Sequence, residues 1–405
     1  MASSGSAGGG QPSWAWMGLL QWSLKYQDGT KPSTETQPMC AEKRAFLEAV
    51  MKDGIVDPAQ EMKLILAKLT DALQAMCPSS SVDTTNTPAT SEEETHEEEK
   101  DSEKTLDNDG MVNALEELSD IVEQIDYARD FVKMNGLPFL LGCASQVDVP
   151  ANIRQGCLGV LATVCQNNPP VQQALLELDA LSVLTGLYLT EVNRDEDGKM
   201  RNKIVQVLSC MVRGHAVGEE SFCRSEHCRL IIENGLGGAI VASSASDSEQ
   251  SEAHSYSPPT VLKRRCVFFL RALLCSDFSS RKRVRDFDPS IIRVINFLDV
   301  NVEDNFDIRE MSINLILQIM EQKHSVNRIM MERDRIVSIG VQRVASLRAL
   351  PDGEEREMYQ EELGMWESLI TELAKATRDE ENEEASAPLM IAGRPPDDSG
   401  TTLAQ

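Results

Sequence analysis

Aromatic residues, basic residues and long apolar runs are all scarce in this chain of 405 residues. Phe, Trp and Tyr make up 5% of the residues although 41% are hydrophobic, which disfavours a β-sandwich because such folds use more aromatic and β-branched side chains. No stretch approaches the roughly 18 apolar residues of a membrane-spanning helix. Asp and Glu outnumber Lys and Arg 65 to 39, giving a net charge of −26. This balance argues against a protein that coats nucleic acid, because phosphate binding needs a positive surface.

Targeting signals and disulfide patterns are missing as well. The apolar residues from Trp14 to Leu20 have no basic residue before them and no small-residue cleavage site after them, so a signal peptide is not expected. The tail Leu403-Ala404-Gln405 is neither a retrieval nor a prenylation signal. The ten cysteines are scattered through apolar stretches. We therefore expect a cytoplasmic protein with reduced, mostly buried thiols.

Catalytic and metal-binding motifs do not occur either. The sequence contains no phosphate-binding loop and no strand–glycine–helix fingerprint, and its five histidines are too scattered for a metallohydrolase motif. The nearest approach to a metal site lacks both the C-x-x-C pair and the helical H-x-x-x-H pair. It consists of Cys210, His215, Cys223, His227 and Cys228. The sequence therefore predicts a binding protein, with no enzyme activity, no metal and no cofactor.

Changes in composition divide the chain into folded and unfolded segments. Glu-rich and Ser-rich runs cannot bury enough apolar surface to offset the entropy of ordering them. In order along the chain, we expect a flexible N-terminal segment with a short amphipathic stretch (1–40), a helical pair (41–76), an acidic disordered linker (77–109), armadillo-like repeats (110–350) interrupted by a disordered insertion (243–260), a C-terminal helix (351–378) and a disordered tail (379–405).

Four apolar segments between residues 110 and 350 repeat one pattern. Each begins with a basic residue and has an aliphatic residue seven positions later. The segments are Arg154 to Asn167, Arg201 to Gly214, Lys263 to Ser276 and Arg309 to Gln322. Their starts are 47, 62 and 46 residues apart, and the longest spacing contains the Ser-rich insertion. A period of about 40–47 residues is typical of armadillo and HEAT repeats, so we predict an all-α, armadillo-like solenoid of four to five helical repeats.

Two features of this solenoid are candidates for binding. The strip from Lys263 to Arg293 carries an excess of six positive charges; it is either a solvated face or a landing site for an acidic partner. Its cluster 281–285 leaves nuclear import open. The second feature is the concave surface, lined by the long third helices of successive units. Two aligned columns on it pair Lys203 with Arg265, and Gln166 with Arg213.

Several short motifs, in a fixed order, resemble those of a known family. They are Leu19-Leu20-Gln21-Trp22-Ser23-Leu24, Arg44-Ala45-Phe46-Leu47, Gln124 to Phe131, Ala162 to Asn168, Met211-Val212-Arg213 and Leu262-Lys263-Arg264-Arg265. Together they resemble the cytosolic armadillo-type nucleotide exchange factors of the seventy-kilodalton heat-shock chaperone, the heat-shock-protein-binding protein family. The resemblance covers residues 16–378. This chain departs from the family at Tyr127, where the family motif has Asn, and in its longer linker and insertion.

The resemblance implies a function and a set of contact residues. In that family the solenoid holds one lobe of the chaperone's ATPase domain and favours the open nucleotide cleft, so that ADP leaves; it does no chemistry itself. A large side chain at Ala128 would then clash with the chaperone. With Lys203 added from the aligned columns, the chaperone-binding residues are Asp126, Ala128, Gln166, Asn167, Lys203, Arg213, Lys263 and Arg265.

The same resemblance implies a second role for the N-terminal segment. In the family this segment is proposed to compete with substrate for the chaperone's peptide groove. The apolar residues that would do so here are Leu19, Leu20, Trp22 and Leu24. The alternative is that they form an amphipathic helix that docks on the solenoid.

Two other functions remain as alternatives. An armadillo adaptor could bind another protein or an extended peptide in its concave groove, but importin-like grooves use Trp and Asn arrays, and the tryptophans lie at Trp14, Trp16, Trp22 and Trp366, outside the repeats. A nucleic-acid-binding repeat needs a continuous basic groove with stacking aromatics, and only one unit is clearly basic. We expect a monomeric co-chaperone with no nucleic-acid or membrane partner.

Overall fold

The structure is a computed structural model in which every described element is a helix. The chain's contacts divide it into two units, Met1–Leu64 and Ile65–Gln405, with the boundary inside α3 (Pro58–Met76). No strand occurs in the described part of the chain, which confirms the all-α prediction there. The described residues are 41–42, 44–45, 57–76, 106–239, 257–322 and 326–386.

Within the second unit, a short helix, a second helix and a long third helix recur four times. The four three-helix sets are α5 (Ile125–Lys133), α6 (Gly136–Ser145) and α7 (Ala151–Cys165); α8 (Pro169–Glu177), α9 (Ala180–Glu191) and α10 (Lys199–Val212); α11 (Ala216–Arg224), α12 (Glu226–Gly235) and α13 (Thr260–Leu274); α14 (Arg281–Asp286), α15 (Asp288–Asn296) and α16 (Phe306–Glu321). Each third helix coincides with one of the four aligned sequence segments. The repeat prediction, an armadillo-like arrangement of three helices per unit, is therefore confirmed.

Further helices flank these four sets. α4 (Asn108–Val122) precedes them, and α17 (Val326–Met331), α18 (Arg333–Arg348), α19 (Glu354–Met358) and α20 (Gln360–Ser386) follow. α20 continues to Ser386, beyond the end expected at residue 378. The extension has a simple cause, because the Glu-rich sequence after Asp379 consists mainly of good helix formers.

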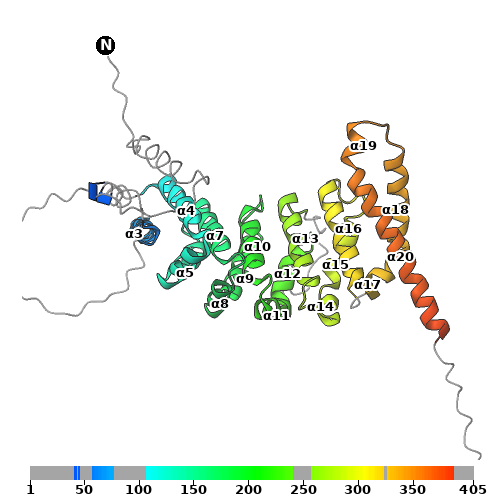
Figure 1. Ribbon diagram of the computed structural model, residues 1–405, viewed down its shortest axis with the longest axis horizontal. Helices are drawn as coiled ribbons and strands as arrows, with labels where there is room; N and C mark the ends of the chain where they lie inside the picture. Colours follow the sequence, from blue (N-terminus) through cyan, green and yellow to red (C-terminus); the bar gives the residue numbers. More distant parts are fainter. Residues whose placement is uncertain are drawn as a thin grey trace, which may run out of the picture. The chain divides into compact units, whose positions relative to one another are not determined.

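The long helices pack against one another in sequence order. α4 contacts α7, which contacts α10, and the series continues through α13 and α16 to α20; Figure 1 shows α7, α10, α13 and α16 side by side. The aliphatic residues at the seventh position after each basic residue have no exposed surface. They are Leu161, Leu208, Leu270 and Ile316. Stacking of successive units therefore makes the core, as the repeat pattern requires.

The basic residue that begins each aligned segment forms an ion pair, and three of the four, Arg154, Arg201 and Arg309, are buried. The four pairs are Arg154–Glu191 at 2.6 Å, Arg201–Asp195 at 3.4 Å, Lys263–Glu303 at 2.7 Å and Arg309–Glu362 at 3.2 Å. Three of these pairs join a third helix to a later part of the chain. The exception is Arg201–Asp195, because Asp195 lies in the loop just before α10, the helix that contains Arg201. In three of the four cases the repeated basic residue thus connects one unit to the part of the chain that follows it. A buried cation needs such a partner because its desolvation is costly.

Gly136 of α6 shows how tightly the first three-helix repeat is packed. A methyl group at this position would lie 2.2 Å from Cζ of Phe131, whose side chain has no exposed surface. We expect Gly136→Ala to lower the free energy of unfolding by about 1–3 kcal/mol through overpacking. Urea unfolding followed by circular dichroism measures this change.

A matched control lies in the same helix. Gly142 has no atom within 4 Å of the position of an added methyl group, so Gly142→Ala should leave stability unchanged or raise it by up to about 1 kcal/mol, because Ala favours helix over Gly. Equal unfolding midpoints for the two variants would contradict the packing described at Phe131.

Candidate protein-binding surface

α4 and the four third helices expose one common face, which we call the ladder surface. On it, side chains from neighbouring helices touch: the Ser119 and Thr163 hydroxyls are 3.1 Å apart, and Arg265 Nε donates to Asn202 Oδ1 at 2.8 Å. The ladder surface consists of Glu116, Ser119, Gln155, Thr163, Asn202, Lys203, Gln206, Arg213, Arg264, Arg265, Phe268, Arg271 and Asn314.

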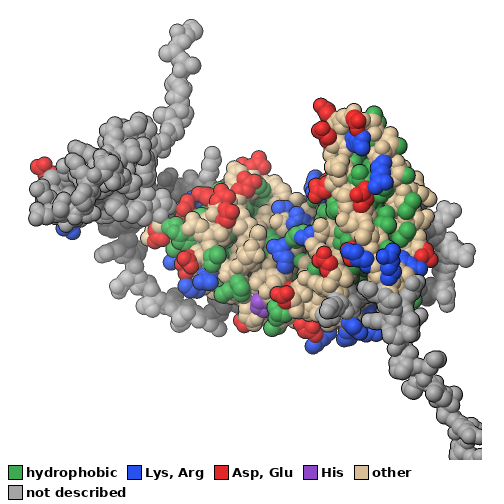
Figure 2. Space-filling model, turned by 45° about the vertical axis from the view of Figure 1, so that its right-hand side comes forward, with side chains coloured by type: hydrophobic (Ala, Val, Ile, Leu, Met, Phe, Trp, Pro, Cys, Tyr) green, Lys and Arg blue, Asp and Glu red, His purple; other side chains and the backbone are tan. Residues whose placement is uncertain are grey.

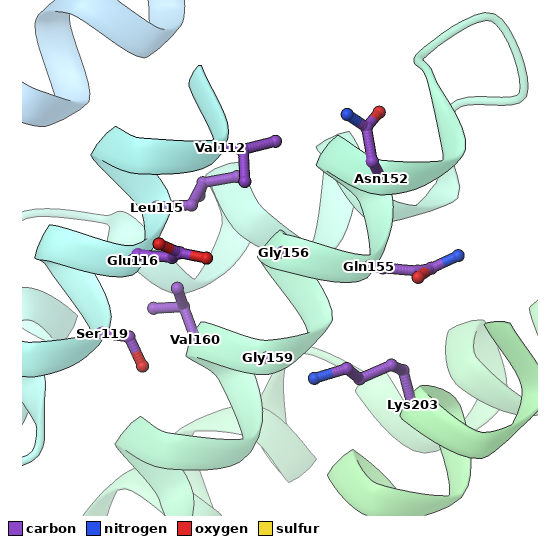
Figure 3. Close-up of a pocket in the computed structure, with 10 residues that line it drawn as sticks. All are labelled: Val112, Leu115, Glu116, Ser119, Asn152, Gln155, Gly156, Gly159, Val160 and Lys203. Atoms are coloured by element: carbon purple, nitrogen blue, oxygen red, sulfur yellow. The ribbon is translucent and has the colours of Figure 1, made fainter. Parts of the chain in front are cut away.

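A groove of about 260 Å³ opens on the ladder surface between α4, α7 and α10. Two glycines of α7, Gly156 and Gly159, lie along it, and Figure 3 shows Glu116 and Lys203 approaching it from opposite sides. A methyl group at Gly156 would lie 2.8 Å from Cδ1 of Leu115, so this glycine allows α4 to pack closely. Sequence reasoning missed the groove. The sequence did contain a signal for the groove, because Gly156 and Gly159 align with the longer polar side chains of Lys203 and Gln206 in the next repeat.

Four cations of the ladder surface have no acidic partner. In the part of the chain that the structure describes, no carboxylate forms an ion pair with them. They are Lys203, Arg213, Arg265 and Arg271, and we call them the cationic cluster. In Figure 2, Lys and Arg side chains gather in the middle of the visible surface with hydrophobic side chains among them. Like charges held together in this way favour the approach of an anionic surface.

Neighbouring polar groups hold members of the cationic cluster in place. Besides the bond from Arg265 to Asn202, Arg271 donates to Asn314 Oδ1 at 3.4 Å. Partial burial lowers the pKa of Arg265, but an arginine remains charged at neutral pH. Burial raises the pKa of the nearby Cys210 thiol more strongly than Arg213 and Arg265 lower it. The surface there is therefore cationic, beside a neutral thiol.

Three other cations of the predicted basic strip are neutralised within the protein. Lys263 is paired with Glu303, Arg264 lies 3.2 Å from Asp307, and Arg283 lies 2.7 Å from the fully buried Glu219. The cluster 281–285 belongs to the helix α14, and the side chain of Arg283 is buried within it. The excess of positive charge in the sequence is thus only partly available to a partner.

The other predicted contact residues lie elsewhere or have structural contacts of their own. Asp126 is exposed on α5, whereas Ala128 is buried with 1% of its surface exposed. Gln166 is exposed at the end of α7. Asn167 has φ = 53°, the left-handed conformation that ends α7, and the aligned Gly214 ends α10 with φ = 74°. The structure thus brings Lys203, Arg213 and Arg265 together on the ladder surface and places Ala128 inside.

The remaining predicted binding residues are the release segment and Lys263. The predicted release residues Leu19, Leu20, Trp22 and Leu24 lie outside the described residues. Lys263, predicted as a contact, has only 11% of its side chain exposed because it pairs with Glu303.

Cysteine and histidine side chains have structural surroundings. The eight described cysteines are free thiols and six are buried, as expected from their apolar contexts; burial raises the pKa of Cys223 and Cys266 to about 12. His215 accepts a hydrogen bond from Gly218 N at the start of α11. Among the described residues, no group of three or more His, Cys, Asp or Glu side chains is arranged to hold a metal ion. No described helix is long and apolar enough to cross a bilayer.

Comparison with known proteins finds Hsp70-binding proteins and an Hsp70 nucleotide exchange factor among the relatives. No protein-family model matches the chain. Hsp70-binding protein 1 of Mus musculus is 27% identical over 218 residues, which are 53% of each chain. The human protein of that name is 26% identical over 215 residues, again 53% of each chain. The Hsp70 nucleotide exchange factor fes1 of Schizosaccharomyces pombe is 30% identical over 106 residues, 26% of this chain and 34% of that one.

These matches are partial. The chain spans about half the length of the Hsp70-binding proteins it matches, 53% in each case. A solved structure, the armadillo repeats only protein ARO of Plasmodium falciparum, matches with a TM-score of 0.40 and 11% identity, covering 65% of this chain and 98% of that one.

Proposed function

We propose that this protein is a cytoplasmic co-chaperone that binds the ATPase domain of an Hsp70-class chaperone through its ladder surface and promotes release of ADP. The cationic cluster carries the proposal, because four charges without acidic partners on one face suit a carboxylate-bearing protein surface. The names of the relatives, which state Hsp70 binding and nucleotide exchange, supply the identity of that partner. We propose that the protein acts as a monomer, without a cofactor or chemistry of its own.

The proposed mechanism is differential binding. A partner that binds the open ATPase domain more tightly than the closed one shifts the equilibrium toward opening by that difference in affinity. A third helix anchored by a buried ion pair, as α10 and α13 are, presents its cations in a fixed arrangement. Lys203, Arg213 and Arg265 are the proposed principal contacts. Asp126, Gln166 and Asn167 lie on α5 and at the end of α7, and we propose them as contacts at the edge of the interface.

The experiment is stopped-flow release of a fluorescent ADP analogue from the purified chaperone ATPase domain. The release rate should increase with the concentration of this protein. For Arg265→Ala, about ten times more protein should be needed for the half-maximal rate, a loss of about 1.4 kcal/mol in binding. The control is Lys282→Ala, an exposed cation of α14 away from the ladder surface, which should match the wild type.

A role for Leu19, Leu20, Trp22 and Leu24 in releasing substrate remains part of the proposal. These residues are apolar in an otherwise polar N-terminal region. Release of a labelled peptide from the full-length chaperone, recorded beside ADP release, tests this role. A variant with these four residues replaced by Ser should still promote ADP release from the chaperone but should lose its effect on peptide release.

An armadillo adaptor for another protein is the second candidate, and the groove between α4, α7 and α10 favours it. No acceleration of ADP release by a folded protein would exclude the exchange function and favour this adaptor.

A further inference from the structure

An aromatic ring lies exposed in the middle of the cationic cluster. Phe268 and Phe269 are adjacent on α13, but only Phe269 is in the core, where its ring centroid lies 4.8 Å from that of Phe222. The Phe268 side chain is 37% exposed on the ladder surface. Leaving a large aromatic ring in water forgoes hydrophobic stabilisation that its burial would give. A partner that covers this ring would recover that stabilisation.

Two guanidinium groups from different helices bracket the Phe268 ring. Arg213, at the end of α10, has its Cζ 5.1 Å from the ring centroid, and Arg271 of α13 has its Cζ 5.9 Å away. Both distances are within the roughly 6 Å over which a cation is attracted to an aromatic face. Arg271 is held from the other side by Asn314 of α16. Cations from two consecutive third helices therefore meet at this ring, and Asn314 of a third such helix holds one of them before a partner arrives.

We propose that Phe268 is the apolar anchor of the partner contact and that Arg213 and Arg271 beside it bind carboxylates of the same partner. The proposal rests on the proposed function, in which that partner is the chaperone's ATPase domain. Aromatic and arginine side chains contribute most of the binding energy at many protein interfaces. A rigid ring also loses little conformational entropy on binding. The site thus fits an acidic protein surface with an apolar side chain between its carboxylates.

The charge of the whole chain selects protein over nucleic acid as the partner. A polyanion would follow a continuous basic path, whereas the cations next to the cluster are neutralised, Lys263 by Glu303 and Arg264 by Asp307. With a net charge of −26, the chain would repel the parts of a long nucleic acid that extend beyond the cationic cluster. A compact acidic patch on a protein could bind by contacting the cationic cluster alone.

Three substitutions at Phe268 test the anchor, with affinity for the ATPase domain measured by calorimetry. Phe268→Ala should weaken binding about 30-fold, the loss typical of an interface hot spot. Phe268→Tyr, which keeps the ring, should stay within about threefold of the wild type, and Phe268→Leu, which keeps apolar area without a ring, should fall between them. The control is Phe278→Ala, since Phe278 is 46% exposed but lies between α13 and α14.

A second probe separates this inference from the proposed function. It is a fluorescein-labelled peptide in which Glu predominates and every fourth residue is Leu, compared with single-stranded DNA of equal charge. Wild-type binding to the ATPase domain with no loss for Phe268→Ala overturns the anchor and leaves the proposed function standing. No binding to the ATPase domain, but Phe268-dependent binding to the peptide, supports the anchor and overturns the proposed function. Binding to neither, or preference for the DNA, overturns the inference.

Discussion

Replacing Glu362 with Gln should lower the free energy of unfolding by about 3–5 kcal/mol, because it leaves two cations without a counter-charge. The Glu362 carboxylate has no exposed surface. It accepts hydrogen bonds from Arg343 at 2.8 and 2.9 Å, from Arg309 at 3.2 and 3.3 Å and from Trp366 Nε1 at 3.3 Å. A single carboxylate thus joins α16, α18 and α20. Urea unfolding followed at 222 nm measures the loss.

The control for Glu362 lies five residues further along α20. Glu367 pairs with Arg348 at 2.7 Å, but 47% of its side chain is exposed. Glu367→Gln should therefore cost no more than about 1 kcal/mol, since water and ions screen an exposed pair. A similar loss for both variants would show that burial of the Glu362 carboxylate does not matter.

The Glu362 carboxylate should also make the free energy of unfolding depend on pH in the acid range. Burial by itself would raise the pKa of Glu362, but the hydrogen bonds from Arg343 and Arg309 outweigh it and hold the pKa below the ordinary value of 4.5. The stabilisation is therefore complete above pH 4.5 and is lost as pH falls through the lower pKa of the folded protein. Below pH 4.5 the wild type should lose stability more steeply than Glu362→Gln, which has no proton to bind there.

Reversing two charges of the cationic cluster should strongly weaken the proposed binding to the chaperone. Arg213→Glu combined with Arg265→Glu places two carboxylates where the proposed partner presents its own. We expect affinity for the ATPase domain to fall by about 100-fold or more, because like charges at an interface repel as well as lose attraction. Neither arginine is paired with a described carboxylate, so the fold should survive the change. Calorimetry and ADP release measure the effect, and circular dichroism checks the fold.

A second double variant isolates position from net charge. Lys282→Glu with Arg285→Glu makes the same change in charge within the same basic strip, but both side chains are exposed on α14. This variant should bind as the wild type does, apart from a modest change in association rate at low salt. Equal losses in the two double variants would mean that total charge, and not the ladder surface, determines binding.

Sequence periodicity predicted the third helices because an aliphatic residue seven positions after a basic one, with further apolar residues on the same face, follows the helical repeat. It could not supply the partners of the basic residues, since Arg154 and Arg309 pair with carboxylates 37 and 53 positions away. Lys263 was predicted to be a contact because its motif, Leu262-Lys263-Arg264-Arg265, resembles that of the family. Its pairing with Glu303 is a tertiary contact that no local pattern reveals.

Two residues show what sequence reasoning gets wrong about a binding surface: one was expected on it and is buried, and the other is exposed on it and was not predicted. Ala128 was predicted as a contact by its motif alone, and its small side chain fits a core as easily as a surface; packing places it inside. Phe268 was missed although a signal existed. Cys266, Phe269 and Leu273 follow the helical spacing of the buried face, and Phe268 falls on the opposite side of that helix.

The buried pairs between units also bear on how the number of repeats can change in evolution. Arg154 of α7 depends on Glu191 of the next unit, Lys263 of α13 on Glu303, and Arg309 of α16 on Glu362. Deleting or duplicating one unit by recombination would separate a cation from its carboxylate at the new junction unless the incoming unit carried an equivalent acid in register. Gain or loss of a single repeat is therefore expected to cost stability at the new junction, because it leaves a desolvated cation without its counter-charge.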